Sequence, residues 1–248
     1  MRIINVKLDE VNLHDTIDII SSWIVNKSPN YICHVPAHAI MSCYEAPELL
    51  DIYNSSGLNV PDGMSIVWIM KMAGYKNVDR VYGPDLLLKM CENGLANGIR
   101  HYFYGGSPQA LEKMIQNIRN MFPGINIVGY NSPPFRELKD YEQEELNAQI
   151  IKSNADIVWV GLGSPKQEAW MKQNIKRING PVMIGVGAAF DFISGNKPQA
   201  PKLIQKIGME WLFRWFSEPR RLFKRYIINY PRFVGLVLIE SIKKKLAK

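Results

Sequence analysis

The sequence Asp156-Ile-Val-Trp-Val-Gly-Leu-Gly-Ser-Pro-Lys-Gln-Glu-Ala-Trp-Met171 contains a short apolar run that ends in a glycine turn. A second run of the same kind follows in Val182-Met-Ile-Gly-Val-Gly-Ala-Ala-Phe-Asp-Phe-Ile-Ser-Gly195. Both runs have the length of a strand and no polar alternation, which is typical of strands buried on both faces. Residues 167–178 between them have a helical pattern. The stretch 157–195 therefore predicts a strand–turn–helix–strand unit of a parallel sheet.

Strand and helix patterns also alternate along the preceding residues. Short apolar runs predict strands at residues 2–6, 31–35, 58–60, 101–104 and 125–130. This alternation predicts an α/β fold, with a Rossmann-like parallel sheet core and helices on both faces. Ligands of such sheets bind outside the carboxyl ends of the strands, which is where the two glycine turns lie.

The positive charge of the chain is concentrated in its last fifth. Residues 196–248 hold 13 Lys and Arg and 3 Glu, whereas residues 1–195 hold 17 Lys and Arg and 20 Asp and Glu. Helical patterns that break at Ser217-Glu-Pro219 and at Pro231 predict an α-helical basic C-terminal appendage after a core of residues 1–195. Its dense cations and aromatic residues favour membrane or polyanion binding over a core-packing helix with a solvated basic face.

Composition excludes several classes of protein. The three cysteines are scattered, and no Cys or His cluster has the spacing of a zinc site, so we expect neither a disulfide framework nor a metal site. The N-terminus lacks the apolar segment of a signal peptide, and no apolar run reaches the roughly 18 residues of a membrane span. These features predict a cytoplasmic protein.

The two glycine turns do not match the dinucleotide fingerprint. Lys166 and Phe190 stand where a third glycine would allow close packing of helix on strand. Their backbone N–H groups at a helix start still favour an anion such as a nucleotide diphosphate. The equally weighted alternative is that these glycines only allow tight turns.

Two acidic residues, Asp62 and Asp191, have both a functional and a structural interpretation, and a third, Asp85, has a structural one. Asp62 follows a predicted strand and could act as a general base, although a helix N-cap is favoured on the pattern alone. Asp191, between two phenylalanines, fits a ribose ligand or a loop-orienting group as well as a turn acid. For Arg80 and Asp85, which flank Gly83-Pro84, a local ion pair is the simplest expectation.

The histidines do not form a metal-binding set. His34 and His38 are four residues apart, but Pro36 lies between them, so they are not expected to share a helix face. His101 is far from both in the sequence. Single core or rim histidines are the favoured interpretation.

Six segments occur in one order along the chain: Pro61-Asp-Gly63, Arg80-Val-Tyr-Gly-Pro-Asp85, Phe103-Tyr-Gly-Gly-Ser-Pro108, Val160-Gly-Leu-Gly-Ser-Pro-Lys-Gln-Glu168, Gly185-Val-Gly-Ala-Ala-Phe-Asp-Phe192, and the tail residues Glu210-Trp-Leu-Phe-Arg214, Glu218-Pro-Arg-Arg221 and Arg225-Tyr226. Each segment alone is a weak signal. Together, in this order and over most of the chain, they resemble the WecG/TagA/CpsF family of bacterial glycosyltransferases.

The resemblance implies an activity. It is an inverting, metal-independent transfer of a sugar from a UDP-sugar, of the N-acetylmannosamine type or a related hexose, to an undecaprenyl-diphosphate-linked saccharide. The family's products enter teichoic acid or other surface polysaccharides, and no cofactor besides the UDP-sugar donor is implied. The resemblance further implies that the basic tail is an appendage that docks on the anionic inner face of the cell membrane and completes the active site. No nucleic-acid partner is implied, and a homo-oligomer is left open.

The resemblance also assigns roles to residues. Asp62 becomes the general base that activates the acceptor hydroxyl, which reverses the preference for an N-cap. Arg80 and Gln167 line the donor site. Arg214 and Arg221, with Arg225, neutralise the charge that develops on the UDP leaving group. The predicted substrate-binding set is completed by Gly105, Gly163, Gly187 and Asp191.

The chain departs from the family pattern at two places. His34-Val-Pro36-Ala-His38 stands where many members have Thr-x-Asn, and Gln199 replaces an arginine that is common before Ala-Pro. The first departure weakens the transfer of donor contacts and is a signal for a different sugar. Two alternatives stay open: a nucleotide-binding oxidoreductase, which the missing third glycines disfavour, and a non-enzymatic polyanion-binding protein, which lacks a recognition-helix motif.

Overall fold

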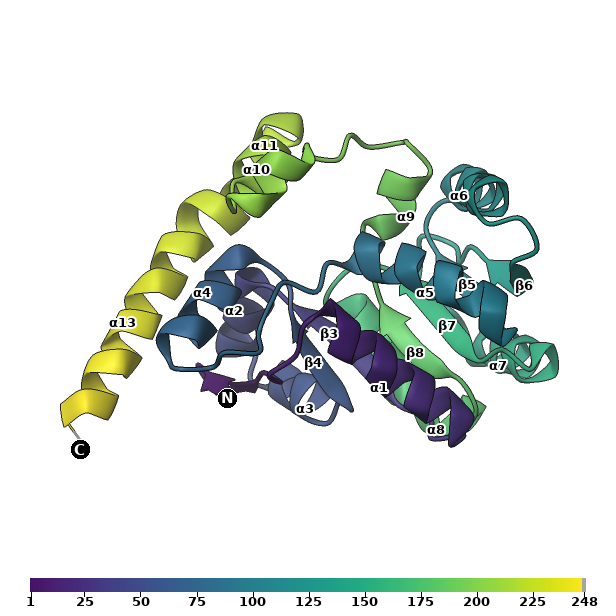
Figure 1. The fold of residues 1–248 in the computed structure, drawn as a ribbon, viewed down its shortest axis with the longest axis horizontal. Coiled ribbons are helices and arrows are strands. Elements are labelled where there is room, and N and C mark those ends of the chain that lie inside the picture. The colour runs from purple at the N-terminus through teal and green to yellow at the C-terminus, as the bar shows by residue number, and fades with distance from the viewer. Residues whose placement is uncertain (247–248) are drawn as a thin grey trace.

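A six-stranded sheet forms the centre of the protein (Figure 1). The structure, a computed structural model, describes residues 1–246. All neighbouring strands of this sheet are parallel, in the order β4-β3-β8-β7-β5-β6. The strands are β3 (Tyr31–Val35), β4 (Leu58–Pro61), β5 (Arg100–Gly105), β6 (Asn126–Asn131), β7 (Ile157–Gly161) and β8 (Val182–Gly185). This arrangement confirms the predicted parallel α/β core.

Helices cover both faces of the sheet. Ile157 and Trp159 of β7 face one apolar cluster, whereas Val158 and Val160 face the other, as expected for a strand buried on both sides. The first cluster also contains α1 (Leu13–Val25), α5 (Gly83–Asn97), α6 (Pro108–Met121) and α9 (Ala189–Ile193). The second contains α2 (Ala37–Glu45), α3 (Glu48–Asn54), α4 (Met64–Met72), α7 (Asp140–Ser153) and α8 (Lys166–Ile178).

The N-terminal residues form a hairpin, so the prediction of one strand at residues 2–6 is wrong. β1 (Arg2–Ile3) and β2 (Val6–Lys7) pair antiparallel. Ile4 and Asn5 have φ angles of 47° and 68°, and this left-handed pair makes the tight turn.

The basic tail is helical as predicted. The predicted break at Ser217-Glu-Pro219 is confirmed, because Glu218 lies outside both flanking helices, whereas the predicted break at Pro231 is wrong. Its helices are α10 (Lys202–Lys206), α11 (Glu210–Ser217), α12 (Pro219–Phe223), the π-helical η1 (Lys224–Asn229) and α13 (Tyr230–Leu246). Gly208, with a φ of 74°, separates α10 from α11. Pro231 does not break the helix: it is the second residue of α13, and the wider π turn before it accommodates its ring.

The tail packs against the core. Figure 1 shows α13 along the side of the molecule that carries α2, and the two helices are in contact. Phe233 of α13 is fully buried in the cluster that includes α2. At Gly208, an added Cβ atom would lie 2.8 Å from the Trp68 side chain of α4, so the start of the tail also approaches the core closely. These contacts bring tail side chains to the carboxyl ends of the strands.

Candidate active site

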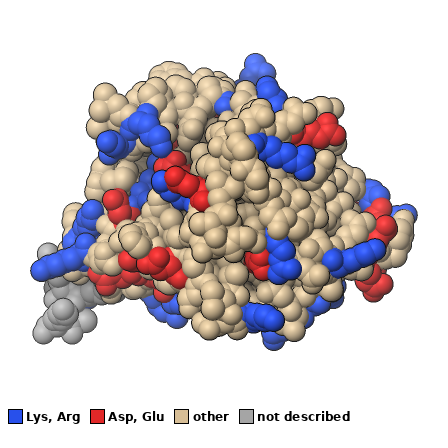
Figure 2. All heavy atoms as spheres, turned by 45° about the vertical axis from the view of Figure 1, so that its right-hand side comes forward, with Lys and Arg blue, Asp and Glu red and all other residues tan. Residues whose placement is uncertain are grey.

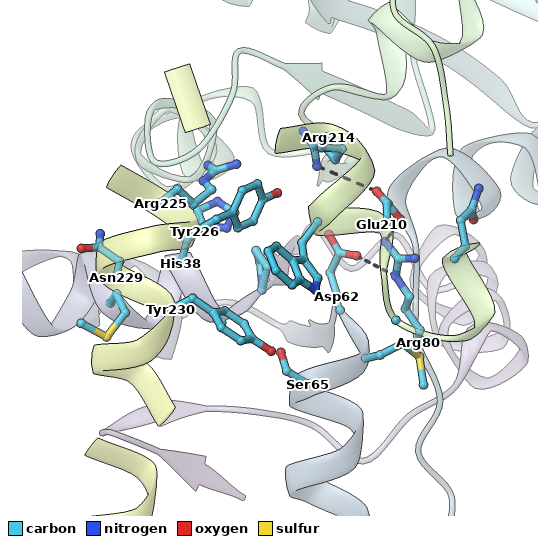
Figure 3. A pocket seen from close by; sticks show the side chains of 18 residues that line it. His38, Asp62, Ser65, Arg80, Glu210, Arg214, Arg225, Tyr226, Asn229 and Tyr230 are labelled. Carbon is cyan, nitrogen blue, oxygen red and sulfur yellow. Dashed lines mark hydrogen bonds and ion pairs between the residues drawn. The ribbon is translucent and has the colours of Figure 1, made fainter. Parts of the chain in front are cut away.

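Two adjoining cavities lie at the carboxyl ends of the parallel strands. Both are lined by Pro36, His38, Asp62, Arg214 and Arg225. The first cavity continues between α2, α4 and the tail and is lined by aromatic side chains of the tail (Figure 3). The second continues under the two glycine turns that follow β7 and β8. The position agrees with the rule that ligands of parallel sheets bind at this edge.

Asp62 lies at the junction of the two cavities. It directly follows β4, and its backbone N–H donates to the carbonyl oxygen of Val35 at the end of β3. Its Oδ1 accepts a hydrogen bond of 3.3 Å from Nε of Arg80. The N-cap of α4 is Gly63, without a side-chain capping bond. The N-cap interpretation of Asp62 is therefore wrong, because its carboxylate faces Arg80 and the cavities.

Arg80 joins the core to the tail. Besides Asp62, its guanidinium contacts Oε2 of Glu210 at 2.7 Å and lies over the Tyr82 ring, with Cζ 4.1 Å from the centroid. Burial lowers the pKa of Arg80, but Asp62 and Glu210 outweigh this and raise it overall. Arg80 is thus a permanent cation between two carboxylates (Figure 3). The prediction of an ion pair between Arg80 and Asp85 is wrong, since Asp85 pairs with Lys202 at 3.1 Å.

Glu210 is a site residue that the sequence analysis missed. It is the first residue of α11 and is buried, and it also lies 4.0 Å from Arg214. Two sequence signals could have singled it out: only three glutamates occur in the basic tail, and Glu210 opens the segment Glu210-Trp-Leu-Phe-Arg214 of the family resemblance.

Gln167 connects the two glycine turns. It is buried in the first turn of α8, its Oε1 accepts the N–H of Gly187 at 3.0 Å, and its Nε2 donates to Oε1 of Glu168 at 2.9 Å. Gly163 and Gly187 line the same cavity with φ angles of 79° and 53°, in the left-handed region. Glu168, which the sequence analysis did not single out, fixes the orientation of the Gln167 amide. Burial raises the pKa of the Glu168 carboxyl.

Three arginines of the tail converge on the cavities. Arg214 of α11, Arg221 of α12 and Arg225 of η1 all line the second cavity. Burial and the neighbouring guanidinium groups of Arg214 and Arg221 lower the pKa of Arg225, although Tyr226 opposes them. Such crowded cations favour a bound polyanion, which would relieve their mutual repulsion.

Two predicted substrate-binding residues lie outside these two cavities. A Cβ atom at Gly105 would come within 2.5 Å of the Gly161 backbone, so the close approach of β5 to β7 explains this glycine. Asp191 pairs with Lys197 at 2.9 Å, and Lys197 also lies 3.4 Å from Glu218 at the start of α12. Asp191 therefore links α9 to the tail.

His34 and His38 both line the second cavity, although the sequence favoured single core or rim positions. The buried His34 bonds through Nδ1 to the carbonyl oxygen of Gly185 at 2.9 Å. The pKa of His38 is lowered by burial and by the nearby Arg225 and Arg214. The two residues that depart from the expected pattern are therefore part of the site.

The described part of the chain, residues 1–246, contains no group of three or more His, Cys, Asp or Glu side chains placed to hold a metal ion. Within the same residues, no helix combines the length and the apolar character needed to cross a membrane.

Known proteins resemble this chain over most of its length. The model of the glycosyl transferase WecG/TagA/CpsF family matches residues 1–247. The N-acetylglucosaminyldiphosphoundecaprenol N-acetyl-beta-D-mannosaminyltransferase of Bacillus spizizenii is 29% identical over 192 residues, which cover 77% of this chain and 72% of the relative. The chain belongs to the WecG/TagA/CpsF family of glycosyl transferases.

Proposed function

We propose that this protein transfers a sugar, with inversion and without a metal ion, from a UDP-sugar to an undecaprenyl-diphosphate-linked saccharide. The donor sugar is of the N-acetylmannosamine type or a related hexose, and the product enters a surface polysaccharide or teichoic acid. One observation carries the proposal: Asp62 stands where two cavities meet, beside a group of tail arginines. The relative from Bacillus spizizenii, whose name specifies this kind of donor group and acceptor, supports it.

Asp62 acts as the general base. Its Oδ1 is held by Arg80, so Oδ2 takes the proton of the acceptor hydroxyl. The hydroxyl oxygen attacks the anomeric carbon from the face opposite the diphosphate. The new glycosidic bond forms as the bond between the anomeric carbon and the phosphate oxygen breaks, and this single in-line displacement inverts the configuration.

The tail arginines take the role that a metal ion has in other transferases. The UDP leaving group gains negative charge as the anomeric bond breaks. Arg214, Arg221 and Arg225 line the cavity into which the glycine turns point, so their guanidinium groups neutralise that charge. The cations come from α11, α12 and η1, which makes the donor site complete only when the tail is docked.

The two cavities divide the substrates between them. The second cavity, with Gln167 and the turns at Gly163 and Gly187, takes the UDP-sugar, because the three tail arginines that line it favour a diphosphate. The first cavity takes the acceptor. Its walls include Trp211, Tyr226 and Tyr230, and aromatic faces suit a sugar and the first part of a prenyl chain.

The proposed location is the cytoplasmic, inner face of the cell membrane, with the protein bound peripherally. The acceptor class is anchored in the bilayer by its prenyl chain. Large apolar side chains are exposed on the tail beside Arg220, Lys224 and Lys243. These are Phe216, Phe223, Ile227, Ile228, Val234, Leu238, Ile239 and Ile242.

Because the chain belongs to a glycosyl transferase family, we no longer propose the two alternatives, an oxidoreductase and a non-enzymatic polyanion-binding protein.

The proposal is tested by incubating the protein with a panel of UDP-sugars, anionic lipid and a prenyl-diphosphate-linked N-acetylglucosamine acceptor. We expect transfer from at least one donor. The absence of transfer from every donor in the panel would refute the proposal.

Asp62→Asn tests the assignment of the base. The variant should bind UDP as the wild type does and lose turnover by roughly 10²- to 10⁴-fold, which is the usual contribution of a general base. The matched control is Asp85→Asn, because Asp85 pairs with Lys202 outside both cavities. Turnover by Asp62→Asn at the rate of this control would refute the role of Asp62.

A further inference from the structure

His34 has an unused hydrogen-bonding atom in the second cavity. It is next to the last residue of β3, only 6% exposed, and lines this cavity together with Gln167 and Gly187. The proposed mechanism gives it no role. The carboxylate of Asp62 and the guanidinium of Arg80 are the charged groups that act on its ring.

The proton of the His34 ring is fixed by its one hydrogen bond. Nδ1 lies 2.9 Å from the carbonyl oxygen of Gly185, and a carbonyl oxygen can only accept, so Nδ1 carries the hydrogen and donates. In the neutral ring, Nε2 is then an acceptor. Nε2 is buried, and no atom of the described residues forms a hydrogen bond with it.

The charged neighbours of His34 do not supply the missing donor. Asp62 is an acceptor when ionised, and the Arg80 guanidinium is directed to Asp62 and Glu210. Burial lowers the pKa of His34, which keeps the ring neutral and the Nε2 lone pair available. A buried acceptor without a partner is unfavourable, so a donor from outside the protein is the expected partner.

We propose that Nε2 of His34 accepts a hydrogen bond from a hydroxyl or amide N–H group of the transferred sugar, and that His34 thereby selects the donor. This inference rests on the proposed function, which places the anomeric carbon beside Asp62. Because His34 lies beside that same carboxylate, the sugar ring comes closer to it than the uracil does. The selection is chemical: a ring with a fixed Nδ1 proton can only accept at Nε2, whereas a hydroxyl side chain could also donate.

Two substitutions separate the two ring nitrogens. His34→Asn can keep the donor to Gly185, because its amide nitrogen occupies the place of Nδ1, but it removes the acceptor at the place of Nε2. His34→Gln can place an amide oxygen near the position of Nε2. Affinities for UDP and for the best UDP-sugar are measured by calorimetry on all three proteins, with thermal unfolding as the check on folding.

We expect His34→Asn to bind UDP as the wild type does and the UDP-sugar at least about tenfold more weakly, since an acceptor–donor pair is lost. His34→Gln should recover part of that loss. Equal weakening for UDP and UDP-sugar would show that His34 only supports the fold and would overturn the inference. Unchanged affinity for both ligands would overturn it as well.

Sugar analogues identify the donor group. Each hydrogen-bond donor of the sugar is removed in turn: a hydroxyl is replaced by fluorine and the N–H of an acetamido group by N-methyl, neither of which can donate a hydrogen bond. One analogue should bind the wild type at least about tenfold more weakly but His34→Asn no more weakly than the parent sugar. If every analogue weakens both proteins equally, His34 does not contact the sugar, although the proposed function stands. If the wild type binds no UDP-sugar at all, both proposals fail.

Discussion

At the scale of single residues, Gln167 shows why an amide rather than an acid is needed between the glycine turns. The oxygen of its amide group accepts a hydrogen bond from the Gly187 N–H, and the nitrogen of the same group donates one to Glu168. A glutamate at position 167 would place a second carboxylate against the buried Glu168. A Cβ atom at Gly185 would lie 2.9 Å from Nε2 of Gln167, so the amide also requires a glycine in β8.

The buried His101 predicts how the stability of the protein depends on pH. It is buried in β5 and accepts a hydrogen bond from Trp159, and burial lowers its pKa from 6.5 to about 4. Between these values the unfolded chain binds a proton that the folded protein does not, so stability falls as the pH falls through this window. We expect this histidine to account for roughly 3 kcal/mol of the loss.

The measurement is urea unfolding at pH 7.5 and at pH 4.5 for the wild type and for His101→Asn, whose amide oxygen can take the place of the accepting Nδ1 but does not titrate. The variant should lose less stability between the two pH values. The same loss in both proteins would show that His101 does not contribute to the pH dependence.

Asp62 illustrates what single residues reveal in the sequence. Its position after a predicted strand placed it at the correct edge of the sheet, but the local pattern favoured an N-cap, and only the family resemblance favoured a base. The N-cap is excluded by contacts that the local pattern does not show, because Gly63 takes the cap position and Arg80, 18 residues later, holds the carboxylate. The contact of His34 in the cavity was not predicted for a similar reason, since its partner Gly185 is 151 residues away.

At the scale of elements, a buried ion pair links α11 to the core. Arg80 and Glu210 are 2.7 Å apart, and their side chains are 14% and 10% exposed. Since a buried pair loses much when one charge is removed, Glu210→Gln should destabilise the protein by about 1–3 kcal/mol. We also expect faster proteolysis of the tail and reduced turnover, because Arg214 is on the same helix.

The matched control is Glu45→Gln. Glu45 also pairs with a tail residue, Arg232, but this pair is exposed, with side chains 38% and 47% accessible. Exposed pairs contribute little, so this variant should resemble the wild type. Equal stability, proteolysis and turnover in the two variants would show that the Arg80–Glu210 pair does not hold the tail.

Local patterns predicted the strands of the sheet well because a strand buried on both faces is continuously apolar. The runs before Gly163 and Gly187 became β7 and β8 with their turns at the cavity. The order of the strands was not readable in the same way, because β8 pairs with β3 across most of the chain. The helix across Pro231 was also mispredicted, since a π turn is not visible in apolar periodicity.

At the scale of the whole molecule, the proposed site is divided between a nearly neutral core and a basic tail. Asp62 and Gln167 come from the core, whereas Arg214, Arg221 and Arg225 come from the tail. On the face drawn in Figure 2, Lys and Arg are interspersed with Asp and Glu and do not form one continuous patch. The cations of the tail lie beside exposed apolar side chains, so attraction to an anionic surface is expected to depend on both together.

The membrane proposal is tested with a triple variant of α13, Leu238→Gln, Ile239→Gln and Ile242→Gln. These side chains are exposed, at 58%, 52% and 57%, so their replacement leaves the packing of the core unchanged. The control replaces three exposed apolar residues outside the tail, as Val25→Gln, Met121→Gln and Phe135→Gln. Sedimentation with vesicles of phosphatidylglycerol, or of phosphatidylcholine alone, measures binding at low and high salt.

The wild type and the control should bind the anionic vesicles at low salt and less well at high salt, because each cation near the surface contributes about 1 kcal/mol and is screened. The α13 variant keeps every cation but loses apolar surface, so it should bind at least about tenfold more weakly. Binding of the α13 variant at the level of the control would place the lipid contact on another face. Failure of the wild type to sediment with anionic vesicles would contradict peripheral membrane binding, while transfer to a short-chain, water-soluble acceptor would still test the chemistry at Asp62.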